Sequence, residues 1–209
     1  QERVAQAERA GELKPISKVL SPHPIATIES LTLFEVLAQK YACNPWDIIR
    51  SAIPPRVASV DKLFTSIQFD KGKPGKTGTT FETFHPFTQP HRQLNALVSE
   101  NFDAGSVLII APDEKDVDQI IESLSESGFS PLKLTAAMQR DQRYSNFLTA
   151  INSDKSIVVG TRSAVFAPVT NLATIIIFKE SSFDHYEVRS PGWNSRTVAQ
   201  LRASQEKLK

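Results

Sequence analysis

The residues best suited to chemistry follow two apolar runs in the second half of the chain. The first run, residues 157–159, leads into Gly160-Thr161-Arg162-Ser163. Two hydroxyls and a guanidinium at the end of a strand can donate hydrogen bonds to phosphate oxygens. We therefore expect Thr161, Arg162 and Ser163 to contact a nucleic-acid backbone, although the triplet alone is equally typical of a turn with a solvated arginine.

The second apolar run, residues 175–178, leads into Lys179-Glu180-Ser181-Ser182. Motor ATPases hold Mg²⁺ with an aspartate at the end of such a strand and orient water with a neighbouring glutamate. Lys179 would repel the metal, and Glu180 alone is typical of a solvated surface carboxylate. We interpret these two residues as a degenerate nucleotide and magnesium site, and we predict no catalytic residue.

A Gly-Lys-Thr triplet at 75–77 suggests a phosphate-binding loop. Such a loop needs a glycine five residues earlier, where this chain has Asp70, and a helix after it, for which there is no signal. A flexible basic linker is the better interpretation, and it could still touch a nucleic-acid backbone. The four histidines have no metal-ligand spacing, so no metal site is predicted.

A cluster of polar and aromatic residues follows the second run. Asp184-His185 could suggest hydrolysis, but no nucleophile elbow accompanies it, and a surface pair is the favoured interpretation. Arg189, Trp193 and Arg196 could form a basic, aromatic surface for single strands. Trp193 could equally be a loop anchor that packs on the core.

Composition sets loose limits on the class of protein. The chain has 209 residues, of which 40% are hydrophobic and 22% charged, and its net charge of +1 demands neither nucleic acid nor membrane as a partner. The lone Cys43 excludes an internal disulfide and a multi-cysteine zinc site, which favours a cytoplasmic location. No apolar run is long enough for a membrane span. The chain begins at Gln1 and stops inside an expected helix, so we expect a fragment of a longer protein.

The elements that would position these residues alternate between strand and helix patterns. Helices are expected at 28–41, where Thr27 is the cap, and at 46–52, where Pro45 takes the first position. After a basic linker, further helices are expected at 92–102, 116–127, 139–151 and 196–209, and strands at 106–110, 132–134, 157–159 and 174–178. This order predicts a parallel sheet with right-handed crossovers, in which the carboxyl ends of the strands form the ligand-binding edge.

Several of these segments resemble the primosomal replication-restart family PriA. Residues 157–168, Asn171-Leu172, 175–177, Tyr186 and Arg196-Thr197-Val198-Ala199 are similar to its first helicase lobe, which typically carries a Gly-Thr-Arg-Ser-Ala run. Leu13-Lys14-Pro15-Ile16, Val19-Leu20 and residues 41–54 resemble the junction between its DNA 3′-end-binding domain and winged-helix region.

The resemblance implies an α/β fold, a RecA-like parallel-sheet helicase lobe of the degenerate P-loop NTPase type. It would be preceded by a small amino-terminal segment from the DNA-binding and winged-helix junction. The expected division is the end of the 3′-end-binding domain (1–22), a helical junction (23–55), a basic flexible linker (56–82) and an incomplete lobe (83–209).

Departures from the family pattern concern its nucleotide chemistry. Residues 85–93 lack the family's Gly-Lys-Thr, Lys179-Glu180-Ser181-Ser182 replaces its Asp-Glu-Glu-His box, and Pro112-Asp113 replaces Pro-Glu. The chain thus resembles the family's degenerate actinobacterial branch. The family uses ATP, magnesium and zinc, the zinc cysteines being expected beyond Lys209, so no cofactor is expected in this chain.

The resemblance implies a DNA-binding replication-restart protein that recognises stalled or forked DNA without helicase activity of its own. Forked or single-stranded DNA and the primosome and helicase-loading proteins would be its partners, and no membrane would be involved. One alternative is an ATP-dependent 3′–5′ DNA helicase that retains ATPase activity. Another is a protein-interaction module in which the lobe serves only as a scaffold.

Overall fold

The computed structural model describes residues 16–21, 24–64, 67, 78–84 and 90–208. The sequence predictions for residues 1–15, for the Gly-Lys-Thr triplet at 75–77 and for residues 85–89 lie outside these ranges. The remainder is an α/β fold whose elements follow the order expected from the sequence.

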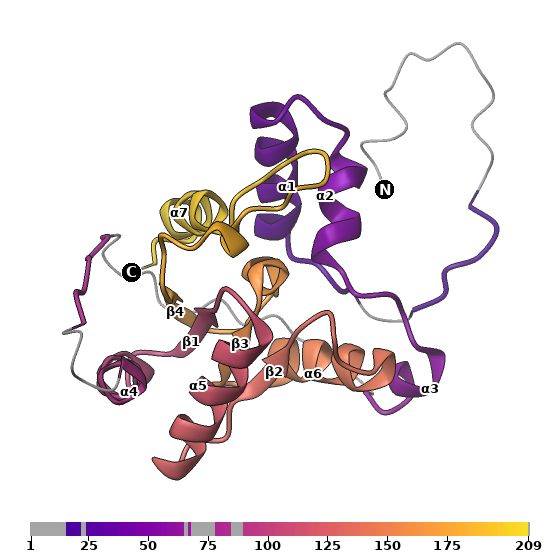
Figure 1. Cartoon of the computed structure of the whole chain (residues 1–209). Coiled ribbons are helices and arrows are strands. Elements are labelled where there is room, and N and C mark those ends of the chain that lie inside the picture. Colours follow the sequence, from indigo (N-terminus) through magenta and orange to yellow (C-terminus); the bar gives the residue numbers. More distant parts are fainter. Residues whose placement is uncertain (1–15, 22–23, 65–66, 68–77, 85–89, 209) are drawn as a thin grey trace.

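A four-stranded parallel sheet forms the centre of the fold, with strand order β2-β3-β1-β4 (Figure 1). The strands are β1 (Ser106–Ile110), β2 (Leu132–Leu134), β3 (Ile157–Gly160) and β4 (Leu172–Ile177). Every residue of β1 is buried, as expected for a strand covered on both faces. The sheet confirms the predicted fold class, and it is consistent with a RecA-like lobe.

Helices cover both faces of the sheet. Because side chains alternate along a strand, Val107 and Ile109 of β1 face one hydrophobic cluster and Leu108 and Ile110 face another. The first cluster includes residues of α4 (Pro90–Phe102) and α5 (Glu114–Glu126). The second includes residues of α6 (Arg140–Asn152) and α7 (Ser195–Glu206). The strand ends are therefore held between two packed helical layers.

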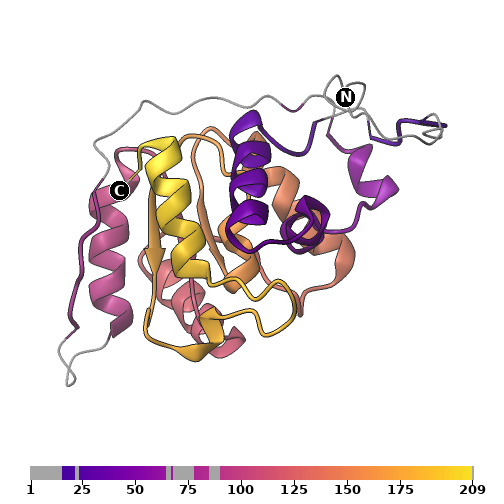
Figure 2. The same ribbon diagram turned by 90° about the horizontal axis from the view of Figure 1, so that it is seen from above.

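Two amino-terminal helices extend the second layer. In α1 (Ile28–Lys40), the Thr27 side chain accepts from the backbone N–H of Ser30, and α2 (Pro45–Ala52) begins with Pro45, both as predicted. Their buried residues join the same cluster as α6 and α7. Helix α7 also lies against α1, as Figure 2 shows. The amino-terminal helices and the lobe thus share one core.

Residues 56–82 were predicted to be a flexible linker, but the structure has a short helix, α3 (Ala58–Asp61), near the start of this stretch. Asp61 is buried and accepts hydrogen bonds from the hydroxyl of Tyr144, at 2.6 Å, and from Nε of Arg56. Burial alone would raise the pKa of Asp61, but these hydrogen bonds outweigh it and hold the pKa below its usual value. The start of the expected linker is therefore anchored to α6.

Candidate nucleic-acid interface

The carboxyl ends of the central strands lie side by side, as a parallel sheet requires. The backbone N–H of Ala111, after β1, donates to the carbonyl of Gly160 at the end of β3, at 2.9 Å. The N–H of Phe178, after β4, donates to the carbonyl of Ile110, also at 2.9 Å. Residues that follow β3 and β4 consequently share one edge of the sheet, which we call the strand-end edge.

Gly160 allows the chain to turn tightly at this edge. A Cβ at this position would lie 2.1 Å from the carbonyl oxygen of Leu134 and 2.5 Å from the Cβ of Ala164. No side chain fits there, because real Cβ atoms do not approach other atoms so closely. The 3₁₀ helix η2 (Arg162–Phe166) can therefore begin immediately after β3.

Two buried side chains hold η2 in place. Phe166 packs against Phe34 of α1 and against Trp193, with ring centroids 6.1 and 4.9 Å apart. The buried guanidinium of Arg202, in α7, donates to the carbonyls of Val165 and Ala167 at 2.8 Å each. The turn that carries Arg162 is thus fixed by α1, α7 and the loop that contains Trp193.

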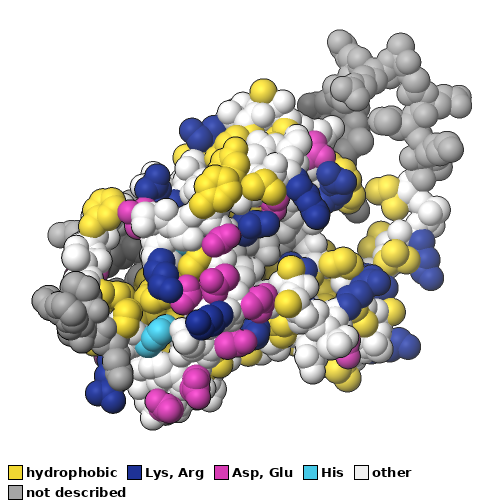
Figure 3. Space-filling view, in the orientation of Figure 1, with side chains coloured by type: hydrophobic (Ala, Val, Ile, Leu, Met, Phe, Trp, Pro, Cys, Tyr) yellow, Lys and Arg dark blue, Asp and Glu magenta, His cyan; other side chains and the backbone are white. Residues whose placement is uncertain are grey.

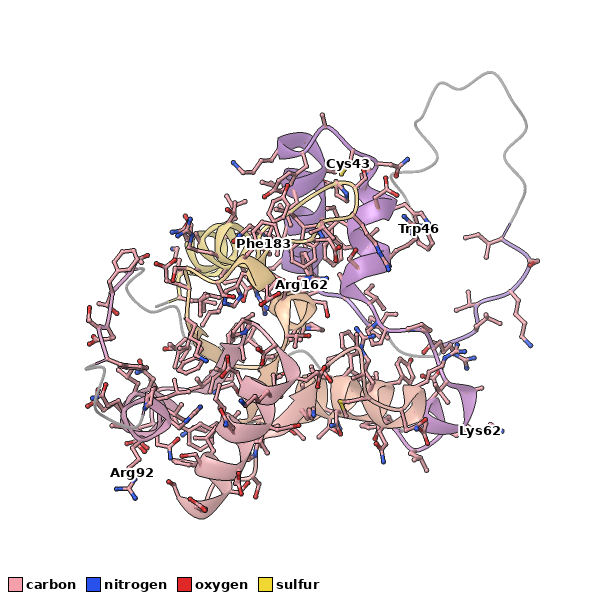
Figure 4. All side chains as sticks on the ribbon, in the orientation of Figure 1. Cys43, Trp46, Lys62, Arg92, Arg162 and Phe183 are labelled. Carbon is pink, nitrogen blue, oxygen red and sulfur yellow. The ribbon has the colours of Figure 1, made fainter. Side chains whose placement is uncertain are left out.

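The Arg162 side chain points toward the loop that follows β4, where Figure 4 places it near Phe183. Its Nε lies 3.2 Å from Oε2 of Glu187, and its Nη1 donates to the carbonyl of Asp184 at 3.3 Å. About a third of the side chain, 35%, is exposed. Nη2 has no partner among the described residues, so donors remain for a ligand.

Thr161 and Ser163 flank this arginine and are half-buried. Their hydroxyls form no hydrogen bond within the described ranges. The structure thus brings the three predicted residues to one edge, with Arg162 as the group that presents charge there.

Lys179, which follows the end of β4, forms an ion pair. It adopts a left-handed backbone conformation (φ 50°), and its Nζ lies 2.7 and 2.8 Å from the two carboxylate oxygens of Asp116. The Asp116 side chain is only 5% exposed, at the start of α5. The sequence analysis missed Asp116 as a partner, because its only local signal was that of a residue in the first turn of a helix.

Glu180 is also paired, since Nη1 of Arg196 lies 2.7 Å from its Oε2. Arg196 is exposed and borders a small cavity of about 250 Å³. Phe183 and Tyr186 line the same cavity, with their ring centroids 5.8 Å apart. Phe183 is 72% exposed, so this loop presents an aromatic face beside a guanidinium.

The interpretation of Asp184-His185 as a surface pair is wrong for the histidine. His185 is fully buried, with Nε2 2.9 Å from the carbonyl of Phe178 and Nδ1 3.0 Å from the hydroxyl of Ser195. The ring links the end of β4 to the start of α7. Partners distant in sequence decided this role, which the adjacent Asp184 did not indicate.

Of the two interpretations left open for Trp193, the structure supports the loop anchor. The side chain is 1% exposed and packs edge-on against Phe166. It offers no face for base stacking. The exposed aromatic residues at this edge are instead Phe183 and Tyr186, which the sequence analysis did not single out as a stacking surface.

A larger cavity of about 540 Å³ runs along β4 between α4, α7 and residues 78–84. Phe81, Phe84, Ile175 and Ile177 contribute to its largely apolar lining. In the described ranges, no group of three or more His, Cys, Asp and Glu side chains could hold a metal ion. None of the helices in the described part has the length and apolar character that a bilayer crossing needs.

A parallel sheet covered by helices on both faces, with polar groups at its strand ends, is consistent with a RecA-like lobe. Comparison with known proteins shows which proteins of this kind the chain resembles. The sequence model of the PriA 3′DNA-binding domain (3′BD) matches residues 2–54, a range that includes α1 and α2.

Curated relatives from mycobacteria match almost the whole chain. It is 28% identical over 98% of its length to the "Probable replication restart protein PriA" of Mycobacterium tuberculosis, and 27% identical over 98% to that of Mycobacterium leprae. It is 32% identical over 48% of its length to the "Replication restart protein PriA" of Synechocystis, of which it covers 12%. The chain is similar to PriA replication restart proteins along almost its whole length, and it spans about a third of the length of the mycobacterial relatives (35% and 36%).

Proposed function

We propose that this chain is a DNA-binding part of a replication restart protein, and that it binds forked or single-stranded DNA without hydrolysing ATP. The observation that carries the proposal is the strand-end edge, where the Arg162 guanidinium lies in one loop region with an exposed aromatic pair. The match of residues 2–54 to a 3′DNA-binding domain supports the same class of ligand.

The chemistry of this edge suits a nucleic-acid strand. Nη2 of Arg162 is available for a phosphate oxygen, and the hydroxyls of Thr161 and Ser163 lie beside it. Phe183 and Tyr186 offer faces on which a base can stack, and Arg196 adds a second positive charge. We infer that Arg162 contacts the backbone while the aromatic pair contacts a base.

The ion pairs at the same edge support a loss of ATP hydrolysis. The ammonium group of Lys179 is bound to both oxygens of Asp116, and Glu180 is bound by Arg196. A magnesium ion at this place would have to displace the ammonium group before it could bind a carboxylate. We therefore propose that these residues do not bind a magnesium–nucleotide complex.

The relatives are named as replication restart proteins, and we propose that primosome and helicase-loading proteins are the protein partners of this chain. The proposal takes the class of process from those names.

A charge-removal experiment tests the DNA contact. We expect Arg162→Gln to weaken binding of a fluorescent single-stranded or forked DNA and to reduce the salt slope for single strands by about 0.7. Arg92→Gln is the matched control, because Arg92 is an exposed arginine on α4, far from Arg162 in Figure 4. Equal affinity and equal salt slope in the two variants would refute the role of Arg162.

Nucleotide binding is measured separately. Labelled ATP is titrated into the chain with and without Mg²⁺, and we expect no saturable binding at micromolar concentrations. Saturable, magnesium-dependent binding would favour the alternative of an ATP-dependent 3′–5′ helicase over our proposal.

A further inference from the structure

We propose that the chain has a second DNA contact, a basic surface formed by α3 and the first turn of α6, which binds the phosphate backbone of duplex DNA. The surface consists of Arg56, Lys62, Arg140 and Arg143, and we call it the α3–α6 surface. The proposal rests on the proposed function and adds to it a separate site and a separate form of DNA.

Hydrogen bonds bring the four cations together. Nη2 of Arg140 donates to the backbone carbonyl of Arg56 at 2.9 Å. Asp61, which precedes Lys62, is bound by Tyr144, which follows Arg143 in α6. Figure 3 shows dark blue side chains over α3 and the adjoining end of α6, and Figure 4 shows Lys62 pointing outward there.

Three of these cations are without a counter-charge. Within the part of the chain that the structure describes, Lys62, Arg140 and Arg143 form no ion pair. Elsewhere in these ranges, six Lys and Arg side chains form ion pairs with carboxylates. These are Arg50–Asp47, Lys133–Asp118, Arg162–Glu187, Lys179–Asp116, Arg196–Glu180 and Arg202–Glu206.

Arg143 gives the clearest indication of a missing anion. It is half-buried, and burial lowers the pKa of its guanidinium, with no opposing effect from a carboxylate. Because Arg143 is half-buried and has no carboxylate partner in the described ranges, a bound phosphate would supply its counter-charge.

Two features identify the polyanion as duplex DNA. The match to a 3′DNA-binding domain ends at residue 54, two residues before Arg56, which supports DNA as the polyanion. The aromatic residues of α6, Tyr144 and Phe147, are buried, so the surface offers charges without stacking faces. Backbone contacts without base stacking are typical of duplex binding, whereas single strands use aromatic platforms.

The opposite charge pattern occurs on α5. Glu114, Asp118, Glu122 and Glu126 recur at four-residue spacing along this helix, and Figure 3 shows magenta side chains over it. A phosphate backbone would be repelled from that side. The charge distribution thus favours one approach for duplex DNA.

The test compares two double variants of the full 209-residue chain. Lys62→Gln with Arg143→Gln removes two cations that make no polar contact in the described structure. Arg92→Gln with Lys115→Gln is the control, and it removes from α4 and α5 two exposed cations that form no ion pair with any described residue. Affinities are measured by fluorescence anisotropy for a blunt duplex and for a single strand, over a series of salt concentrations.

We expect the first double variant to reduce the salt slope for duplex DNA by about 0.9 per cation removed, and to leave the single-strand affinity unchanged. The control is expected to match the wild type with both probes. Equal losses of duplex affinity in the two double variants would overturn the proposal, as would a wild-type chain that binds single strands but not duplex. A wild-type chain that binds neither probe would instead refute the proposed function.

Discussion

Removal of the Asp61 carboxylate should destabilise the fold by an amount that the structure allows us to work out. Asp61→Ala leaves the Tyr144 hydroxyl, which is fully buried, without its acceptor. An unsatisfied buried donor costs about 1–3 kcal/mol. The lost pair with Arg56 adds about 1 kcal/mol at most, because that side chain is 32% exposed and water can replace the contact. We therefore expect a loss of about 1–4 kcal/mol in the free energy of unfolding at pH 7.

Urea unfolding measures this loss, and a second substitution separates its causes. Tyr144→Phe removes the hydroxyl and leaves Asp61 with Arg56, so its cost should be about 1.5–3 kcal/mol. The double variant should be less destabilised than the sum of the two single variants, because no orphaned hydroxyl remains. Strict additivity would show that the hydrogen bond between these residues is not what stabilises the site.

The pH dependence provides an independent check on the same carboxylate. Its pKa is lowered in the folded state, so its stabilising contribution is fully present above the unfolded pKa of about 3.9. That contribution is lost as the pH falls through the folded pKa. The difference between wild type and Asp61→Ala should thus be constant from about pH 5 to 8 and shrink below about pH 4. A difference that grows in acid would refute the reasoning.

Three further substitutions test the packing of the strand-end edge. Phe166→Ala should lower the free energy of unfolding by about 3–5 kcal/mol in urea, because it empties the contact between α1, η2 and the Trp193 loop. Gly160→Ala should prevent folding, as judged by circular dichroism, because its Cβ would overlap a backbone carbonyl. The control Gly78→Ala should fold normally, because no atom lies within 4 Å of the added Cβ. Lys179→Ala should cost about 1–3 kcal/mol in thermal unfolding, because it leaves the buried Asp116 carboxylate without its cation, and an unchanged melting temperature would contradict this role.

Much of the fold could be predicted because its signals are local. The strands at 106–110 and 132–134 were predicted to the residue. The first contains a continuous apolar run, and the second is a short Leu-Lys-Leu segment that follows Pro131. Helix α5 begins two residues earlier than predicted, because the Asp113 side chain accepts from the backbone N–H of Asp116 and caps the helix. In the sequence, Asp113 had been considered only as part of the Pro112-Asp113 pair that replaces the family's Pro-Glu.

The contacts that define the site could not be predicted, because they join residues distant in sequence. Asp116 and Lys179 are separated by 63 positions, and Asp61 and Tyr144 by 83. Each of these residues, taken alone, resembles an ordinary surface group. Only the packing of α5 beside the end of β4, and of α3 against α6, turns them into buried pairs.

The ion pairs of the strand-end edge differ in a way that bears on function. A motor protein must exchange partners at this edge each time a nucleotide binds and leaves. Lys179 binds both oxygens of the buried Asp116 at 2.7 and 2.8 Å, and this pair joins the end of β4 to the start of α5 in one arrangement. Arg162 contacts Glu187 through one longer bond of 3.2 Å, and its Nη2 has no partner among the residues that the structure describes. A phosphate can therefore compete for Arg162 without disturbing the Lys179 pair, so we expect DNA binding to leave the lobe in one conformation, whereas nucleotide binding would first have to break that pair.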